Sequence, residues 1–160
     1  MHFLRNHSNY PMFTKPCYGQ GGVGSFLLSD YDAPSDRIKH SNGSSEPVQE
    51  FVDRVLFQTA SQFHLVESGY LFQDVVDQHR AINEFQGREA VSGFRVVVLN
   101  RPEGPKVLLA TWKLAIGSNV TDNFSLGDKG NLVAQVNLAS GTADFAVNGI
   151  WPGVDRLDKH

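Results

Sequence analysis

Four glycines occur within six residues near the start of the chain, between two short apolar segments, and this feature constrains the fold most strongly. The segments are residues 11–15 and 25–29, and their composition predicts two β-strands. The glycines at the tip of this hairpin are Gly19, Gly21, Gly22 and Gly24. A simple turn needs fewer glycines, whereas several together let backbone N–H groups converge on one point without crowding by Cβ atoms. The sequence therefore predicts a phosphate-binding loop.

Two common phosphate loops do not fit the residues that follow. A Walker loop ends in Gly-Lys-Ser/Thr and opens a helix, and a dinucleotide-binding fingerprint also requires a following helix. Here Ser25, Phe26 and Leu27 continue the loop into a predicted strand. A glycine loop between two strands is the geometry of protein kinases and of ATP-grasp enzymes. The chain lacks the His-Arg-Asp and Asp-Phe-Gly signatures of kinases, and Lys15 precedes the loop instead of following it.

Length and charge narrow the class of protein. A chain of 160 residues with 41% apolar side chains is expected to form one domain with a hydrophobic core. The formal net charge of -3 gives no global basic field for a nucleic acid, and no apolar run approaches the ~20 residues of a membrane-spanning helix. The six histidines are scattered, which predicts no zinc site. One cysteine and the absence of a secretion signal favour a cytoplasmic protein.

Apolar residues at steps of three and four predict a helix over residues 47–63. Ser44 or Ser45 is expected to cap its first N–H groups. The preceding residues 30–45 are almost wholly polar, which predicts a flexible loop.

The rest of the chain predicts a second, short helix and an antiparallel sheet. Residues 70–76 predict a strand, and residues 77–85 predict a helix capped by Asp77 and ended by Gly87. Turn residues then separate four predicted strands, at residues 92–99, 106–116, 132–138 and 143–147. The expected fold is an α+β domain, in which a glycine-loop hairpin and a helix pack with an antiparallel sheet.

The order of Lys15 and the glycine loop resembles the ATP-grasp superfamily. Two further segments follow in the order of that family. Residues 71–76 (Leu-Phe-Gln-Asp-Val-Val) look like the hinge strand, whose main chain reads the edge of adenine. Residues 93–98 (Gly-Phe-Arg-Val-Val-Val) are similar to the Asp-Ile-Arg strand of the glutamate-ligase-like members.

The later segments point to one branch of this superfamily. Residues 109–113 (Leu-Ala-Thr-Trp-Lys) resemble the next family strand, and residues 122–127 (Asp-Asn-Phe-Ser-Leu-Gly) resemble an asparagine followed by a Gly-Gly turn. Together with the turn at residues 139–142, this pattern is closest to the sugar-transfer-associated branch. The resemblance covers residues 11–149.

The resemblance implies a site for ATP with Mg²⁺. It places Lys15 at the α-phosphate and folds Gly19, Gly21, Gly22 and Gly24 over the β- and γ-phosphates. It assigns the adenine to Gln73, Asp74, Val75 and Val76.

The resemblance also assigns residues to the reacting end of ATP. Arg95 and Lys113 are the implied catalytic cations, and Asp122 and Asn123 are the implied metal ligands. The implied reaction activates a small carboxylate or a sugar-linked substrate as an acyl phosphate, which an amine or a thiol then attacks. The implied activity is that of an ATP-dependent carboxylate-amine or carboxylate-thiol ligase.

The sequence departs from the family pattern at several positions. Lys113 stands where an arginine is usual, so the bidentate fork that suits phosphate is lost. Asp128 replaces the second glycine of the turn, and Gly153-Val154-Asp155 echoes a Gly-x-Asp strand without the Glu-x-Asn segment that follows it in the family. We therefore expect a truncated piece that lacks an amino-terminal lobe and the carboxy-terminal metal-binding strands. Substitute metal ligands would be Asp122, Asp128 and Asp144.

Alternatives remain at each position. The glycine tip is also compatible with an ordinary turn, Arg95 with an outward strand residue paired to an acid, and Cys17 with an inert thiol. At the level of function, the alternative is a non-catalytic or degenerate ATP-grasp-like domain that binds a protein or a glycan. The sequence predicts neither the acceptor substrate nor the oligomeric state.

Overall fold

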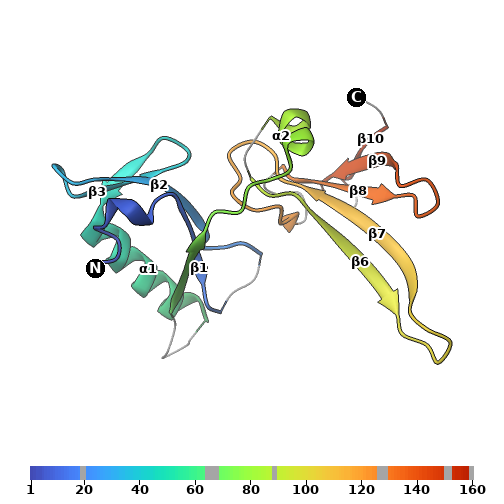
Figure 1. Cartoon of the computed structure of the whole chain (residues 1–160), viewed down its shortest axis with the longest axis horizontal. Coiled ribbons are helices and arrows are strands. Elements are labelled where there is room, and N and C mark those ends of the chain that lie inside the picture. Colours follow the sequence, from blue (N-terminus) through green and yellow to red (C-terminus); the bar gives the residue numbers. More distant parts are fainter. Residues whose placement is uncertain (19–20, 64–68, 88–89, 126–129, 150–152, 159–160) are drawn as a thin grey trace. The chain divides into compact units, whose positions relative to one another are not determined.

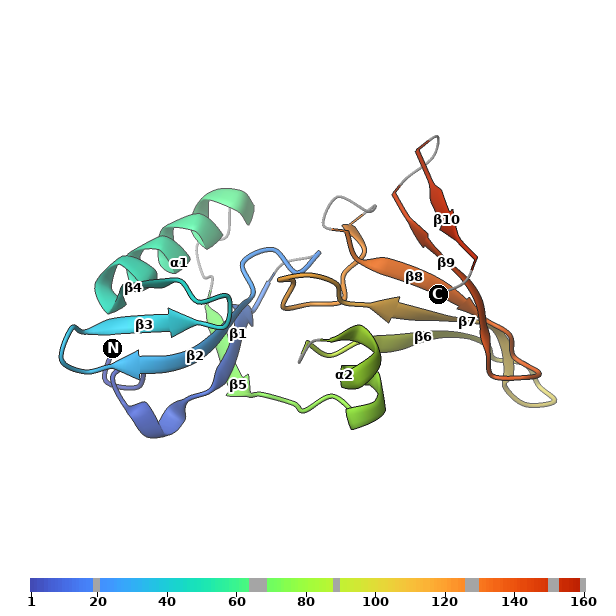
Figure 2. The ribbon, with the colours of Figure 1, turned by 90° about the horizontal axis from the view of Figure 1, so that it is seen from above.

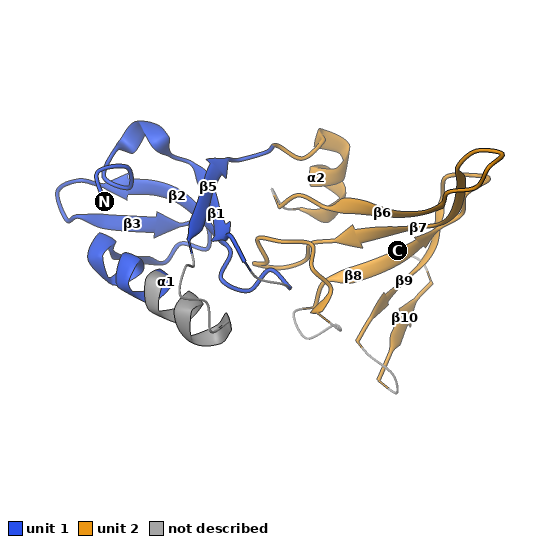
Figure 3. Ribbon diagram, turned by 90° about the horizontal axis from the view of Figure 1, so that it is seen from below, with its two compact units in different colours: residues 1–76 blue, residues 77–160 orange. Residues whose placement is uncertain are grey.

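The computed structural model describes residues 1–18, 21–63, 69–87, 90–125, 130–149 and 153–158, and for residues 56–63 it describes the backbone alone. The chain forms two compact units, unit 1 at residues 1–76 and unit 2 at residues 77–160 (Figure 3). Each unit holds one antiparallel five-stranded sheet, and helices accompany both sheets. This confirms the predicted α+β class.

The sheet of unit 1 has the strand order β4-β3-β2-β1-β5 (Figure 2). Its strands are β1 (Met12–Pro16), β2 (Phe26–Asp32), β3 (Arg37–His40), β4 (Ser45–Pro47) and β5 (Tyr70–Asp74), and a short 3-10 helix, η1 (His7–Asn9), precedes them. β1 pairs antiparallel with β2, with Phe13 opposite Leu27. The predicted hairpin around the glycines is therefore present.

The long helix α1 (Val48–Phe63) covers the predicted range. Val48, Phe51 and Val55 recur at steps of three and four and are buried against Met12 and Leu28 of the sheet. This burial of apolar surface supplies the core of unit 1.

The predicted serine cap of α1 is wrong. Ser45 lies in β4, where its Oγ accepts a hydrogen bond from Arg37 Nε at 3.1 Å. The first helical N–H group, that of Val48, instead donates to the carbonyl oxygen of Asp36 at 3.0 Å. A main-chain acceptor from the neighbouring hairpin thus replaces the side-chain cap.

The prediction of a loop over residues 30–45 is also wrong, because β2 extends to Asp32 and β3 and the start of β4 lie in this segment. In β3 only Ile38 is buried, while the charged Lys39 stays at the surface and pairs with Asp30 at 3.0 Å. The turn between β3 and β4 uses Gly43, whose φ is +87°. A strand with one inward apolar residue carries too little hydrophobic alternation for the sequence pattern to reveal it.

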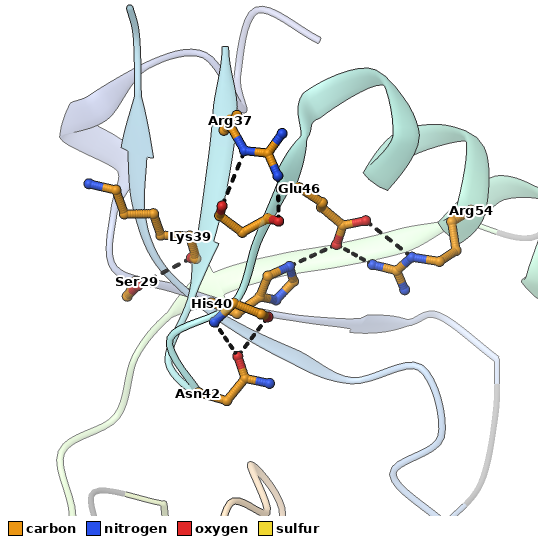
Figure 4. A network of polar contacts seen from close by, with 9 residues as sticks. Ser29, Arg37, Lys39, His40, Asn42, Glu46 and Arg54 are labelled. Carbon is orange, nitrogen blue, oxygen red and sulfur yellow. Dashed lines mark hydrogen bonds and ion pairs between the residues drawn. The ribbon is translucent and has the colours of Figure 1, made fainter. Parts of the chain in front are cut away.

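A polar cluster joins β3, β4 and α1 (Figure 4). Glu46 Oε1 lies 2.7 Å from His40 Nε2, and both Glu46 oxygens accept hydrogen bonds from Arg54. The Arg54 guanidinium lies 4.7 Å from the centre of the Phe26 ring and 5.5 Å from that of Phe51. The cluster therefore holds α1 against the strand that follows the glycine loop.

The amino terminus is tied to the β2–β3 turn by Arg5. Its Nε and Nη2 donate to the two carboxylate oxygens of Asp36 at 2.8 and 2.7 Å, and the Tyr31 hydroxyl donates to Asp36 Oδ1 at 2.9 Å. The hydrogen bonds from Arg5 lower the pKa of Asp36 below its ordinary value of 3.8.

We expect Asp36→Asn to weaken the pH dependence of stability below about pH 4. A carboxyl whose pKa is lower in the folded state stabilises the fold above its unfolded pKa and loses that contribution as the pH falls through the folded pKa. The variant lacks this contribution. Asp30 still makes a contribution of the same kind, because its hydrogen bond from Lys39 lowers its pKa. Melting midpoints measured from neutral to acid pH check this, with the exposed Glu103→Gln as a control that keeps the original slope.

Unit 2 holds a meander with the strand order β10-β9-β8-β7-β6 (Figure 1). Its strands are β6 (Gly93–Leu99), β7 (Lys106–Leu114), β8 (Leu132–Val136), β9 (Ala143–Asn148) and β10 (Asp155–Leu157). The first four agree with the predicted strands, apart from their ends. The sequence did not predict β10, because three residues of which two are charged offer no hydrophobic pattern.

The short helix α2 (Arg80–Gln86) begins three residues later than predicted. Its N-cap is His79, whose Nδ1 accepts from the Ala81 N–H group at 3.3 Å, so the assignment of the cap to Asp77 is wrong. Gly87 ends the helix as predicted, with a φ of +65° and its N–H group bonded to the Asn83 carbonyl.

The outer part of β6 and β7, residues 94–99 and 107–109, is named here the β6–β7 arm. Its apolar side chains are about half exposed, from 40% at Val97 to 59% at Phe94. Because successive strand residues point to opposite faces, both faces of the arm are apolar.

Candidate functional site

The glycine loop has the backbone conformation that its composition predicts. Gly21, Gly22 and Gly24 all have positive φ angles, between +69° and +73°. A Cβ atom on Gly24 would lie 2.8 Å from the Tyr70 hydroxyl oxygen and 3.1 Å from Pro16 Cγ. The loop is therefore packed closely against β1 and β5 at this glycine. Gly19 lies outside the described residues.

Lys15 and the predicted hinge lie on neighbouring strands of unit 1. β1 pairs antiparallel with β5, so that Lys15 is opposite Leu71 and Phe13 is opposite Gln73. Directly opposed residues share a face, which places these four side chains on the face away from the buried Met12. Lys15 is exposed and has no hydrogen-bond or ion-pair partner among the described residues.

The remaining hinge residues lie at the end of the β1–β5 ladder. Asp74 is the last paired residue of β5, and Val75 and Val76 follow it without strand structure. Their main-chain groups are outside the ladder, as reading an adenine edge would require. Unit 1 thus places Lys15 and Gln73 on one face of the β1–β5 ladder, whereas Gly24 contacts Pro16 and Tyr70, a directly opposed pair whose side chains belong to the other face.

Unit 2 brings together the two predicted catalytic cations. In the β6–β7 register, Gly93 is opposite Lys113 and Arg95 is opposite Thr111. Arg95 and Lys113 are therefore diagonal neighbours on one face of the sheet, a separation of about 7–8 Å between strand positions. Arg95 is exposed and has no polar partner within the described part of the chain, so its alternative interpretation as an acid-paired residue gains no support.

Lys113, in contrast, is engaged by Asp122. The Lys113 Nζ atom lies 3.0 Å from Asp122 Oδ1, and the Gly93 N–H group donates to Asp122 Oδ2 at 3.1 Å. Both side chains of the ion pair are largely buried, with exposures of 18% and 27%. A Cβ atom on residue 93 would lie 3.0 Å from Asp122 Oδ2, so a side chain there would require the carboxylate to shift by a few tenths of an ångström.

The site contains a residue that the sequence analysis did not identify. Asn131 is completely buried, and its Oδ1 accepts from the Ile116 N–H group and from Asn119 Nδ2, both at 2.8 Å. Its Nδ2 donates to the carbonyl oxygens of Thr121 and Asn123, at 2.8 and 2.7 Å. The only sequence signal was a polar residue directly before an apolar strand, which many surface positions share.

The predicted metal ligands form no ready magnesium site in this arrangement. The two oxygens of Asp122 are bonded to Lys113 and Gly93, and the side chain of Asn123 contacts Ser125. Asp144 is exposed on β9, and Asp128 lies outside the described residues. Over the described ranges, no group of three or more His, Cys, Asp and Glu side chains is placed to hold a metal ion. The donor set does not fit Mg²⁺ by itself, since that ion prefers several oxygen ligands.

A comparison with models of known protein families shows which family the chain belongs to. The model of the sugar-transfer associated ATP-grasp family matches residues 2–160. The chain belongs to this family. No curated protein and no solved structure matches the chain.

The ATP-grasp match spans both compact units, and the two antiparallel sheets with their helices are consistent with an ATP-grasp-like fold. An ATP-grasp domain is an ATP-binding domain of the ligase type. Among the described residues of this ATP-grasp chain, no helix has the length and apolar content that crossing a bilayer requires.

Proposed function

We propose that this chain is the ATP-binding domain of a ligase that joins a small carboxylate or a sugar-linked substrate to an amine or a thiol. The observation that carries the proposal is the position of Lys15. In an ATP-grasp chain, an exposed lysine without a described partner lies on the face of β1 and β5 that also carries Gln73, and a loop of positive-φ glycines follows it on the same hairpin. A cation together with the N–H groups of a glycine loop is the environment that a polyphosphate requires.

Unit 1 would bind the nucleotide. The Lys15 ammonium would meet the α-phosphate and the amides of the glycine loop the β- and γ-phosphates. The main chain after Asp74 would read the adenine, with Phe13 and Leu71 offering apolar contact on the same face. These contacts would fix the orientation of ATP before the reaction.

Unit 2 would stabilise the charge that develops during phosphoryl transfer. A substrate carboxylate oxygen attacks the γ-phosphorus, the bond from that phosphorus to the bridging oxygen breaks, and ADP leaves. The amine or thiol then attacks the acyl carbon, loses its proton and releases inorganic phosphate. Arg95 and Lys113 lie on one face and would neutralise the phosphoryl oxygens in the first step. In this proposal, Mg²⁺ accompanies the ATP phosphates.

A second candidate function is a degenerate domain that binds a protein or a glycan without catalysis. The observation that favours it is the pairing of Asp122 with Lys113, which uses one implied metal ligand and one implied catalytic cation to neutralise each other. Such a domain would retain the fold without turning over ATP.

The deciding experiment is a calorimetric titration with ATP, with and without Mg²⁺, of the chain and of Lys15→Ala. We expect micromolar to low-millimolar affinity that falls at least tenfold in the variant, about 1.4 kcal/mol. Lys39→Ala removes the same charge from the same sheet, at a lysine paired with Asp30, and is expected to keep the affinity within about twofold.

Binding of equal strength in the Lys15 and Lys39 variants would contradict the assignment of Lys15. No binding to the unaltered chain at millimolar Mg-ATP would contradict ATP binding by this chain and favour the degenerate domain.

A further inference from the structure

Asn131 joins four points of one connecting segment. Its side chain bonds to Ile116, Asn119, Thr121 and Asn123, which follow β7, while Asn131 itself directly precedes β8. An asparagine amide can accept at its oxygen and donate two hydrogens, and here both ends are used twice. A completely buried amide with all these bonds holds its surroundings in one arrangement, because any other arrangement leaves buried polar groups without partners.

The segment that Asn131 holds carries Asp122. Its two anchored carbonyl groups belong to Thr121 and Asn123, the residues on either side of Asp122. The position of the Asp122 main chain is therefore fixed from both sides. Its carboxylate reaches back to the sheet, where it bonds to the Gly93 N–H group and to Lys113.

The Lys113 ammonium consequently has a defined direction. A lysine side chain on a strand has several rotatable bonds and no preferred direction of its own. Here it points to Asp122 Oδ1 at 3.0 Å, and the pair is only 18% and 27% exposed. The chain of contacts runs from Asn131 through the main chain of residues 121–123 to Asp122 and then to Lys113.

We propose that Asn131 is a positioning residue of unit 2, which through Asp122 sets the direction and the availability of the Lys113 ammonium for a phosphate. Its relevance to ATP rests on the proposed function, whereas its effect on Lys113 exists without ATP. Asn131 touches no nucleotide in this scheme. It decides whether a cation that flanks Arg95 is held by the protein or moves freely.

The test uses Asn131→Asp, which keeps the size of the side chain and an acceptor for Ile116 and Asn119. The variant lacks the two amide hydrogens that Asn131 donates to the carbonyl oxygens of Thr121 and Asn123. A carboxylate oxygen faces those two carbonyl oxygens instead. We expect Lys113 to lose its partner, so that an amine-acylating reagent modifies it about fivefold faster in the absence of nucleotide. Peptide mass spectrometry measures the rate, and the exposed Lys106 in the same molecule serves as the internal reference.

A matched control separates positioning from general destabilisation. Ser92 is also buried in unit 2, where its Oγ donates to Gln86 at 2.5 Å and accepts from the Ala115 N–H group at 3.0 Å. Ser92→Ala loses these buried hydrogen bonds without touching residues 119–123. It is expected to lower the melting midpoint and to leave the Lys113-to-Lys106 modification ratio unchanged.

The second readout is a double-mutant cycle on Mg-ATP affinity. If Asn131 acts through Lys113, Lys113→Ala weakens binding less in the Asn131→Asp background than in the unaltered chain. In the Ser92→Ala background, Lys113→Ala weakens Mg-ATP binding by the same factor as in the unaltered chain. Additive effects of Asn131→Asp and Lys113→Ala, together with an unchanged modification ratio, would overturn the proposal.

The two proposals fail separately. A raised Lys113 modification ratio in a chain that binds no ATP would support the positioning role and contradict the proposed function. If Asn131→Asp does not fold by circular dichroism, Asn131→Ala takes its place, since it also removes the two hydrogens that bond to Thr121 and Asn123 and places no carboxylate against those carbonyl groups. A raised ratio in that variant supports the proposal, and an unchanged ratio overturns it.

Discussion

Phe51→Ala is expected to lower the free energy of unfolding of unit 1 by about 3–5 kcal/mol. Phe51 is completely buried, and its ring centre lies 5.6 Å from that of Phe26 and 6.1 Å from that of His40. Alanine removes the transfer free energy of the ring and leaves a cavity between α1 and the sheet. The free energy of unfolding of a domain is only about 5–15 kcal/mol in total, so a loss of this size removes a large part of it.

Urea unfolding followed by tyrosine absorbance measures this loss. All four tyrosines lie in unit 1 and both tryptophans in unit 2, so the tyrosine signal reports on the altered unit. Phe3→Ala is the matched control, because Phe3 is 50% exposed and contacts Phe72 at the surface. We expect it to cost about 1 kcal/mol. Equal losses in the two variants would contradict the placement of Phe51 in the core.

Glu46→Ala is expected to cost about 2–3 kcal/mol, the next largest effect. Its carboxylate accepts hydrogen bonds from Arg54 and contacts His40 (Figure 4), with Oε1 2.7 Å from His40 Nε2. The Glu46 side chain is 21% exposed. Removing the carboxylate leaves a partly buried guanidinium without its counter-charge, against the rings of Phe26 and Phe51.

The chain offers a matched pair for comparison. Arg80 and Glu84 form an ion pair on α2, but their side chains are 90% and 63% exposed. Glu84→Ala is therefore expected to cost less than about 0.5 kcal/mol. Denaturant unfolding of both variants checks the difference. A Glu46→Ala loss as small as that of Glu84→Ala would mean that the cluster does not hold α1 to the sheet.

The features that the sequence predicts best are those with a repeating hydrophobic pattern. α1 follows from the steps that bury Val48, Phe51 and Val55, and the first four strands of unit 2 follow from apolar segments between turn residues. The family follows from the order of short motifs along the chain, and the match over residues 2–160 confirms it.

The features that the sequence could not predict depend on partners far apart in the chain. β3 contains one buried apolar residue and is held by pairing with β2, which the pattern of its own residues does not reveal. His79 and not Asp77 caps α2, because the helix begins at Arg80, later than the polar residues before it indicate.

The candidate site shows the same division. Lys15, Arg95 and Lys113 could be named from motifs, but the ion pair of Lys113 with Asp122 depends on how the segment after β7 folds back onto that strand. Asn131 is important only because of the four groups that surround it, and a single asparagine carries no such information in a sequence.

The β6–β7 arm has a consequence for how copies of the chain behave in concentrated solution. Its valines and leucines are about half exposed on both faces, and β6 ends the described sheet, so its side chains add little to the stability of the fold. An apolar strand at the end of a sheet is a template for another strand. Arg95 on β6 and Arg101, Glu103 and Lys106 near the tip supply the charge that opposes such pairing. We therefore expect the concentration at which copies of the chain associate to depend on these four side chains and on the ionic strength more than on the packing of the cores.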